Sequence, residues 1–545
     1  MHGIEKPLQG NMISVKVKKN IIHIKCKVKA SLGDTYAFQE LRLLYRVGKE
    51  EQEQEQKQEF SFPLTICKKT KNDITFRSAI NLNEVELKPI YWDFQLVAAK
   101  GDQSVSIELK NRSYLTYAKD CLLFFENKYE YGDGMFVYPY VSSIRGIALQ
   151  YRKKTQYDDY RLKLKERLAV LRFILTYPWL RHKKIFLVYE KFCDMAQDNG
   201  FYFFKYCMEH HMEKQLNRSI FYVIDKHAAD RGRLEPYQKN VIDFMSTRHL
   251  AYGLAARLLI SSESKTHIYA KTKGSALAPF IKRKKAVFLQ HGVTGLKKVP
   301  TFQKGKSGSS NLFIVCSEFE KNIVKHHLGY KDEEIAVTGF ARWDVLKDGQ
   351  NENREILIMP TWRSWLEHTS DETFKKSSYY RNYMELLQSE QLKELLVKHD
   401  LELTFYIHPK FKEYMKNFVV TNEERIHLTP FGQEPLNGIM MRCKMLITDY
   451  SSVSWDVLYM KKPVVFFQFD YDGYMSQSGS YMDLKTQLLG ERVERVGSLL
   501  QVIEQYADNG FALREEYEKK QHDYFKYIDQ DNSKRICEAI VQRGF

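Results

Sequence analysis

The sequence predicts an α/β protein in which an N-terminal β-rich domain precedes two doubly wound domains that face a cleft. Short runs with period-two alternation fill the region from Asn11 to about Tyr117, and this pattern is typical of antiparallel strands. After residue 183, short apolar runs alternate with helical segments in two successive series, which indicates buried parallel strands with crossover helices. The length of 545 residues also exceeds what one hydrophobic core supports, about 250–300 residues.

The first 118 residues are predicted to form an accessory β domain, a small antiparallel sandwich. Its strands are expected in runs such as "ISVKVKKNIIHIKCKVKA" and "YWDFQLVAA". The charged, low-complexity segment "KEEQEQEQKQEF" interrupts these runs, and we expect it to be a loop.

Residues 119–182 are predicted to form a linker that contains a basic amphipathic helix. Leu164, Leu168, Leu171 and Leu175 recur at helical spacing among many Lys and Arg residues. Such a helix can lie on an anionic membrane. It can equally pack its apolar side on a neighbouring domain, because any surface helix has one.

Residues 183–335 and 336–545 are predicted to form the two doubly wound domains. Strands are expected at "KIFLVYE", "SIFYVI" and "KAVFLQHG" in the first domain, and at "EILIMPTW", "LELTFYIHP" and "PVVFFQF" in the second. Ligands of such domains bind at the carboxyl ends of the strands. The candidate functional residues of this chain follow those ends.

The composition favours a polyanionic partner. The formal net charge is +16, which suits phosphorylated substrates, acidic membranes or nucleic acid. We expect no nucleic-acid partner, since there is no zinc-finger spacing and no RNP-like motif. No Walker A, GxGxxG or GxSxG motif occurs, which disfavours an ATPase, a dinucleotide enzyme and a serine hydrolase.

The cysteines and apolar runs predict a cytoplasmic protein. The eight cysteines are scattered without a CxxC pair, which is typical of reduced core residues. The opening residues "MHGIEKPLQGN" have no apolar signal region, and no run approaches the roughly 18 apolar residues of a membrane-spanning helix.

Two histidines end strands in different domains. His291 directly follows "KAVFLQ", and His408 ends "LELTFYI" before Pro409 turns the chain. An imidazole that titrates near neutral pH suits a general base. A buried histidine satisfied by a carbonyl is the alternative for either residue alone, but together they predict one cleft with a histidine on each side.

The segment "LITDYSSVSWDVL" predicts an anion site. Ser451 and Ser452 stand where a helix is expected to begin, and Asp456 lies one turn inside it. Free N–H groups and small hydroxyls at a helix start suit a phosphate. Plain N-capping by Asp449 or Ser451 is the alternative.

Further candidates are weaker individually. Arg342 follows a glycine turn, and Thr361 and Arg363 follow a strand. Arginine suits phosphate oxygens, although most surface arginines are solvated or paired with carboxylates. Asp470 and Asp472 are interpreted as loop residues and not as a magnesium site. We therefore expect no metal site and no cofactor.

The ordered motifs "LQHG", "VTGFARWDVL", "MPTWR", "IHPK" and "TDYSSVSWDVLYMKKPVVFFQFD" resemble the CDP-glycerol glycerophosphotransferase family, the teichoic-acid primases and polymerases. The earlier "EKFCDMAQDNGFYFFKY" resembles its first-domain signature, and the resemblance covers roughly residues 184–489. It implies a GT-B fold of two Rossmann-like domains facing a cleft. It also implies transfer of glycerol phosphate or ribitol phosphate from a CDP donor to a hydroxyl of a growing teichoic-acid-type polymer, with release of CMP.

The resemblance also implies partners and residue roles. The partners are a CDP-polyol donor, a lipid-linked polyol-phosphate acceptor and the anionic cytoplasmic face of the cell membrane, where the protein is expected to be peripheral. His291 would be the base, and His408, Ser451, Ser452 and Asp456 would hold donor groups. Gln290, Gly292 and Thr294 would lie beside the donor, and Arg342 and Thr361 would hold its phosphates and nucleotide.

The sequence departs from the family pattern at two places. The family's His-Gly-Thr-Pro-Leu-Lys is one residue longer here, "HGVTGLKK", and Tyr406 stands where an arginine is frequent. Both departures are compatible with ribitol in place of glycerol. A GT-B glycosyltransferase that uses a nucleotide sugar and a non-catalytic polymer-binding protein are the alternative functions.

Overall fold

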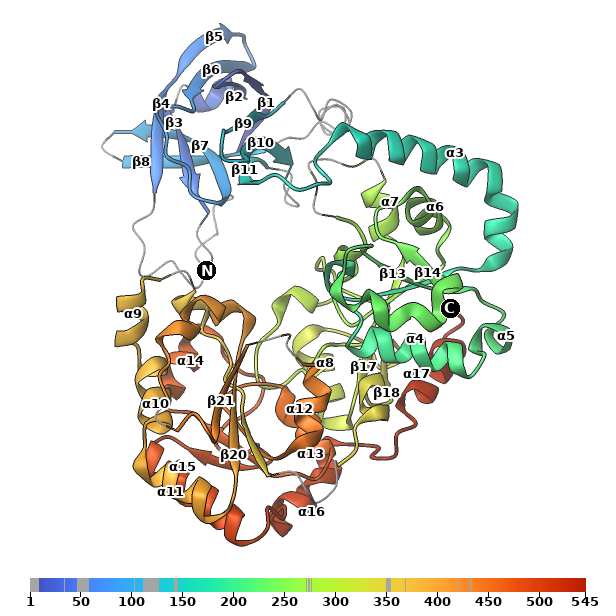
Figure 1. The fold of residues 1–545 in the computed structure, drawn as a ribbon. Coiled ribbons are helices and arrows are strands. Elements are labelled where there is room, and N and C mark those ends of the chain that lie inside the picture. The colour runs from blue at the N-terminus through green and yellow to red at the C-terminus, as the bar shows by residue number, and fades with distance from the viewer. Residues whose placement is uncertain are drawn as a thin grey trace. The chain divides into compact units, whose positions relative to one another are not determined.

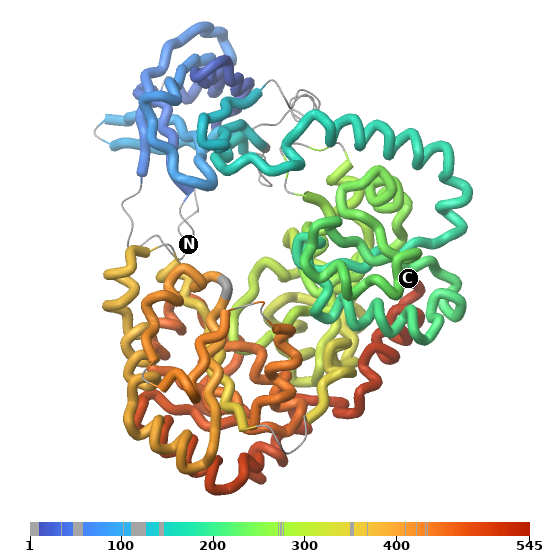
Figure 2. The backbone as a smooth tube through the Cα atoms, in the orientation of Figure 1, coloured from blue at the N-terminus to red at the C-terminus, as the bar shows by residue number. Residues whose placement is uncertain are grey.

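The computed structural model, shown in Figures 1 and 2, describes most of the chain as two compact units. The described residues are 9–33, 35–46, 58–101, 103–110, 127–141, 146–270, 272, 275, 277–348, 354–367, 369–420, 422–430, 432 and 434–545. The first unit comprises Met1–Leu168 with Ala270–Pro279, and the second Ala169–Tyr269 with Phe280–Phe545. Cys121 and most of the charged loop predicted at 49–60 lie outside the described residues.

The first unit, predicted as a small antiparallel sandwich, contains one continuously hydrogen-bonded sheet. Among the described residues it has eleven strands, ordered β5-β6-β2-β1-β8-β7-β11-β10-β9, with β3 paired to β7 and β4 paired to β3. All pairings are antiparallel except β1 with β8. The strands are β1 Gln9–Lys18, β2 Ile21–Lys29, β3 Ala37–Tyr45, β4 Glu59–Pro63, β5 Thr65–Lys69, β6 Asp73–Asn81, β7 Ile90–Lys100, β8 Gln103–Lys110, β9 Tyr129–Glu130, β10 Met135–Val141 and β11 Ile147–Lys153, and the short helix α1 is Ala30–Gly33.

This sheet continues past the boundary expected at residue 118. Strands β9, β10 and β11 lie in the region predicted as linker, yet β11 pairs with β7 and β10 with β11. Val137 and Leu149 from these strands are buried in the same core as Trp92 and Leu41. The β domain therefore needs these later strands to close its core.

Helix α3, Tyr160–Lys183, is the predicted basic helix, and it is apolar on two sides. Leu162, Ala169 and Leu180 are buried. The four leucines predicted to share a side are all exposed, with exposed fractions of 55% for Leu164, 46% for Leu168, 54% for Leu171 and 72% for Leu175. Packing therefore accounts for one side of this helix and leaves the leucine side open.

The first half of the second unit is a seven-stranded parallel sheet, ordered β14-β13-β12-β15-β16-β17-β18. Counted along the chain, its first six strands have the 3-2-1-4-5-6 order of a Rossmann domain. The strands are β12 Phe186–Tyr189, β13 Ile220–Ile224, β14 Val241–Asp243, β15 Leu258–Ser261, β16 Lys285–Phe288, β17 Leu312–Val315 and β18 Ile335–Val337.

The second half has the same order in a six-stranded parallel sheet, β21-β20-β19-β22-β23-β24. Ile356 and Ile358 pack into one core and the intervening Leu357 into another. Burial on both faces explains why these strands are apolar throughout. The strands are β19 Glu355–Ile358, β20 Glu402–Ile407, β21 Ile426–Pro430, β22 Cys443–Thr448, β23 Val464–Phe467 and β24 Glu491–Val493.

The helices of the second unit alternate with these strands, as predicted (Figure 1). They are α4 Asn199–Glu209, α5 Met212–Leu216, α6 Thr247–Ala255, α8 Glu318–Leu328, α9 Asp371–Lys376, α10 Ser378–Leu387, α11 Glu390–Lys398, α12 Leu436–Arg442, α13 Val453–Tyr459, α14 Tyr471–Gln477, α15 Val496–Asp508, α16 Glu515–Tyr524 and α17 Asn532–Gln542, and α7 Ala278–Lys282 lies at the junction between the units. Two Rossmann-like halves of this kind make a GT-B fold.

The last helix, α17, returns to the first half, where Figure 2 shows the red C-terminus beside green segments. Cys207 Sγ in α4 lies 3.8 Å from Cys537 Sγ in α17, and Arg543 donates to the carbonyls of Glu333 and Ile335. The domain boundary expected between residues 335 and 336 falls inside β18, which belongs to the seven-stranded sheet of the first half. The seven described cysteines are free thiols, of which Cys67 is exposed.

Candidate active site

A cavity of about 280 Å³ lies between the halves of the second unit and contains most of the residues predicted from the sequence. Both His291 and His408 line it, as expected for histidines at the carboxyl ends of facing sheets. The same cavity is lined by Gln290, Gly292, Thr294, Thr361, Ser451 and Ser452. Of the predicted site residues, Arg342 and Asp456 lie elsewhere.

A buried network fixes the turn that presents His291. Gln290 follows β16 with a φ of +63°, a conformation that is strained for a residue with a side chain. Its Nε2 donates to Glu320 Oε1 at 2.9 Å, and its Oε1 accepts from Thr294 Oγ1 at 2.6 Å. The backbone N–H of Thr294 also donates to Glu320. Gln290 and Thr294 therefore shape the loop, with side chains committed to protein partners.

His291 is exposed enough to reach a substrate. Its side chain is 48% exposed, and its Nδ1 lies 3.9 Å from Oε1 of Glu263, which follows β15. A carboxylate at this distance attracts a protonated imidazole. The arrangement suits a histidine that takes a proton from a hydroxyl and is then stabilised in its charged form.

Gly292 is required by the close approach of the opposite half. A Cβ added at this glycine would lie 2.1 Å from Ser452 Oγ and 2.9 Å from Ser452 Cβ. No side chain fits at that distance. The two motifs that the sequence places far apart are therefore in direct contact across the cavity.

His408 is surrounded by cations. Burial, followed by the nearby charges of Lys191, Lys410 and Lys297 in that order, lowers the pKa of His408 to about 4. Its Nδ1 accepts the N–H of Lys410 at 3.2 Å, so the neutral ring carries its proton on Nε2. His408 therefore presents a hydrogen-bond donor within a positive environment, which suits a phosphate oxygen.

Thr361 and Asp449 lie at the topological switch point of the second sheet. Thr361 follows β19, its N–H donates to Asp449 Oδ1 at 2.8 Å, and its Oγ1 is buried without a hydrogen-bond partner among the described residues. Arg363 is fully buried and pairs with Asp449 and Asp470 at 2.9 and 2.7 Å. Asp470 is thus an arginine partner, and Arg363 is not available to a ligand.

The start of α13 is only weakly capped by side chains. Ser452 makes no side-chain capping bond, and Ser451 Oγ accepts from Val453 N at 3.4 Å. Asp449 does not cap the helix, because its carboxylate binds Thr361 and Arg363. Of the sequence alternatives, capping by Asp449 is excluded by this geometry, and both serines line the cavity.

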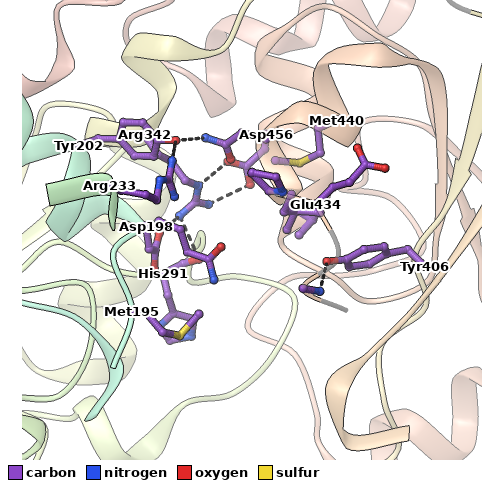
Figure 3. A pocket seen from close by; sticks show the side chains of 16 residues that line it. Met195, Asp198, Tyr202, Arg233, His291, Arg342, Tyr406, Glu434, Met440 and Asp456 are labelled. Carbon is purple, nitrogen blue, oxygen red and sulfur yellow. Dashed lines mark hydrogen bonds and ion pairs between the residues drawn. The ribbon is translucent and has the colours of Figure 1, made fainter. Parts of the chain in front are cut away.

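Arg342 and Asp456 bind each other instead of facing the main cavity. Arg342 donates to Asp456 through Nε at 2.6 Å and Nη2 at 2.9 Å, and to Asp198 through Nη1 at 2.9 Å (Figure 3). Burial lowers the pKa of Arg342, but Asp456 and Asp198 outweigh it and raise the pKa. Arg342 also donates to the His291 carbonyl at 3.0 Å. In this geometry the pair joins the halves and supports the His291 loop, and the donor contact of Arg342 stays a prediction.

Sequence reasoning missed three residues at the site. Lys297 lines the main cavity and lies in the "VTGLKK" segment that departs from the family pattern. Glu263 follows strand β15 and belongs to none of the motifs, so its position after a strand was the available signal. Asp198 lies in the segment "EKFCDMAQDNGFYFFKY" and caps the start of α4, but no role was predicted for it.

The described part of the chain contains no group of three or more His, Cys, Asp or Glu residues able to hold a metal ion. Over the same residues, every helix is too short or too polar to cross a bilayer.

The chain is similar to known proteins of one family. The family model for CDP-Glycerol:Poly(glycerophosphate) glycerophosphotransferase matches residues 172–542. The minor teichoic acid biosynthesis protein GgaB of Bacillus subtilis (strain 168) is 26% identical over 455 residues, which are 80% of this chain and 48% of GgaB. The teichoic acid ribitol-phosphate polymerase TarK of Staphylococcus aureus (strain NCTC 8325 / PS 47) is 25% identical over 285 residues, 46% of this chain and 51% of TarK.

Among solved structures, the wall teichoic acid polymerase TagF has a TM-score of 0.46 and 16% identity, covering 70% of this chain and 98% of the TagF chain. The present chain spans about half the length of GgaB and TarK. The family match runs through both Rossmann-like halves, and this chain therefore belongs to the CDP-glycerol:poly(glycerophosphate) glycerophosphotransferase family.

Proposed function

We propose that this protein transfers glycerol phosphate or ribitol phosphate from a CDP-activated donor to a hydroxyl of a growing teichoic-acid-type polymer. The observation that carries the proposal is the cavity of about 280 Å³ with His291 on one side and the cation-surrounded His408 on the other. Relatives named as ribitol-phosphate and glycerol-phosphate transferases support the substrate class.

In the proposed reaction, His291 takes the proton of the acceptor hydroxyl. The hydroxyl oxygen forms a bond to the distal phosphorus of the donor, and the bond from that phosphorus to the bridging oxygen breaks. CMP leaves with that oxygen and its electron pair. Glu263, 3.9 Å from His291, stabilises the imidazolium that forms.

The donor's diphosphate is assigned to the second half and to Lys297, which faces it from the first half. His408 Nε2–H, Lys297 and the hydroxyls of Ser451 and Ser452 all border the cavity. Positive charge and hydrogen-bond donors aimed at phosphate oxygens also stabilise the charge that develops on the leaving CMP. The buried, unpartnered Thr361 Oγ1 gains a partner when a donor binds.

Two measurements test this proposal. The first is nucleotide release from a panel of CDP-polyols and nucleotide sugars, and the second is the activity of a His291 variant. We expect CMP release from CDP-glycerol or CDP-ribitol, and none of UDP or GDP from nucleotide sugars. Removal of a general base costs about 10²–10⁴ in rate, so His291→Ala should lose at least about a hundredfold in CMP release while retaining CDP binding. His522→Ala, at an exposed histidine, is the control.

Three outcomes would contradict the proposal. Release of UDP or GDP would indicate a glycosyltransferase, and no turnover would indicate a polymer-binding protein. A His291→Ala rate within about tenfold of wild type would exclude His291 as the base.

We also propose a peripheral position on an anionic membrane surface. The leucine side of α3 is exposed, and Arg161, Lys165 and Arg167 lie on the same helix. Near its end, a cavity of about 390 Å³ has Arg181, Lys184, Arg257 and Lys284 as its only described charged lining residues. Basic groups beside an exposed apolar helix suit anionic lipid headgroups.

A further inference from the structure

The second unit contains another cavity, of about 170 Å³, which the donor assignment leaves unused. Figure 3 shows it between the two halves, with side chains from each. Among the described residues, His291 is the only one that lines both this cavity and the larger one. The candidate base therefore stands between two separate spaces.

We propose that this smaller cavity receives the hydroxyl-bearing end of the acceptor, a polyol joined to a phosphate. The inference rests on the proposed transfer reaction, in which two substrates must meet at one base. The larger cavity holds the histidines, lysine and serines that suit a diphosphate. The smaller cavity has about 170 Å³ against about 280 Å³ for the larger one, so of the two it suits the end of a chain better than a nucleotide.

Arg233 supplies the cation for the acceptor phosphate. Its guanidinium lies over the Phe201 ring at 4.6 Å and donates to the Ala196 carbonyl at 2.8 Å and to Tyr202 Oη at 3.3 Å. No carboxylate of the described residues is within ion-pair distance of it, whereas Arg342 in the same wall is fully paired. Arg233 is thus a positioned cation without a counter-ion.

The rest of the wall suits a polyol. Tyr202 Oη already accepts N–H groups from Asn437 at 3.0 Å and from Arg233, so its own proton is available to a ligand oxygen. Glu434 adds a carboxylate that accepts hydroxyl hydrogen bonds, and Met195 and Met440 add flexible apolar surface for the carbon chain.

Tyr406 also lines this cavity. It stands two residues before the motif histidine, where an arginine is frequent in the family motif, so the cavity wall differs in charge at this position. With a tyrosine there, the wall carries less positive charge and more hydrogen-bonding surface. At Tyr406 the wall therefore contacts the hydroxyl groups of the acceptor more than its negative charge.

The experiment uses sn-glycerol 3-phosphate and ribitol 5-phosphate as mimics of the acceptor end. Their binding to the CDP-saturated full-length protein is measured by calorimetry, and CMP release from the CDP-polyol is measured against mimic concentration. Arg233→Met keeps an apolar stem on Phe201 and removes the charge. Charge-assisted hydrogen bonds are the strong ones, so we expect at least about tenfold weaker binding of the mimic with CDP affinity retained, and partial recovery in Arg233→Lys.

Two further variants keep the test decisive. Arg231→Met removes a neighbouring arginine that pairs with Asp243 at 2.7 Å and should leave mimic binding unchanged. Tyr202→Phe should weaken the mimic by a few-fold, and it replaces Arg233→Met if that variant fails to fold. Weakened CDP binding in Arg233→Met would assign the cavity to the donor, and unchanged mimic binding would overturn the proposal. If wild type binds the mimic but releases no CMP from any CDP-polyol, the transfer reaction is wrong and the polyol-phosphate site stands.

Discussion

At the residue scale, Gly292 shows how little space separates the two halves. A Cβ there would approach Ser452 Oγ to 2.1 Å, closer than any non-bonded contact. We predict that Gly292→Ala displaces Ser452 and weakens CDP binding by about tenfold, an amount typical of losing one hydrogen bond to a charged group. Calorimetric titration with CDP measures this.

The matched control for that glycine is Gly497, in helix α15, where an added Cβ meets nothing within 4 Å. Gly497→Ala should keep CDP affinity and raise the melting temperature slightly, because alanine is the better helix residue. Equal CDP affinities for both variants would show that Ser452 does not contact the donor.

His408 predicts a pH dependence of stability. Because burial and Lys191 hold its folded pKa at about 4, below the ordinary value of about 6.5, the unfolded chain takes up a proton in this window that the folded protein does not. Stability therefore falls as the pH is lowered from about 6.5 to about 4. His408→Gln cannot titrate, so its melting temperature should fall less over the same window.

His522→Gln, at an exposed histidine, provides the comparison for replacing an imidazole elsewhere in the chain. Parallel profiles for His408→Gln and wild type would mean that His408 is not held neutral in the folded protein.

At the element scale, α3 is the feature whose two sides have different environments. Leu171 and Leu175 are 54% and 72% exposed, so replacing both by glutamine should leave the melting temperature unchanged. If these leucines enter a bilayer, replacing them weakens membrane binding by about 1.5–3 kcal/mol of free energy for each fully buried leucine. We predict at least about tenfold less co-flotation with phosphatidylglycerol vesicles.

Val397→Gln is the control for an exposed aliphatic residue on another helix, α11, with an exposed fraction of 57%. It should float as wild type does. Wild-type flotation of the double leucine variant would remove α3 from the membrane contact, and equal flotation with phosphatidylcholine vesicles would remove the role of charge.

At the scale of the whole second unit, the Arg342–Asp456 pair connects the halves. Its side chains are 8% and 1% exposed, and removing one partner of a buried pair costs about 3–5 kcal/mol. We predict that Asp456→Ala lowers the free energy of unfolding by this amount in urea titration while CDP still binds. Glu504→Ala, which breaks the exposed pair with Lys398, should leave the free energy of unfolding nearly unchanged, because exposed ion pairs stabilise little. A loss of CDP affinity without a loss of stability would instead support the donor contact implied by the family motif.

Much of this organisation was predictable because it is local. Apolar runs such as those of β16 and β20 indicated buried parallel strands. A residue that directly follows such a strand was expected at the edge of the sheet where ligands bind. That is why His291, His408, Thr361 and Ser451 were found from the sequence. The linker at 119–182 was predicted in place of β9–β11 because short strands carry a weak period, and their partner β7 lies far back in the chain.

The sequence by itself determined the two series of strands, the ordered motifs and hence the family. Only the tertiary structure decided that Arg342 pairs with Asp456, that Gly292 touches Ser452, that the leucine side of α3 is open and that His291 borders two cavities. These relations join residues more than a hundred positions apart, or depend on what covers a surface. Local periodicity carries no such information, because the packing of one half against the other sets these distances.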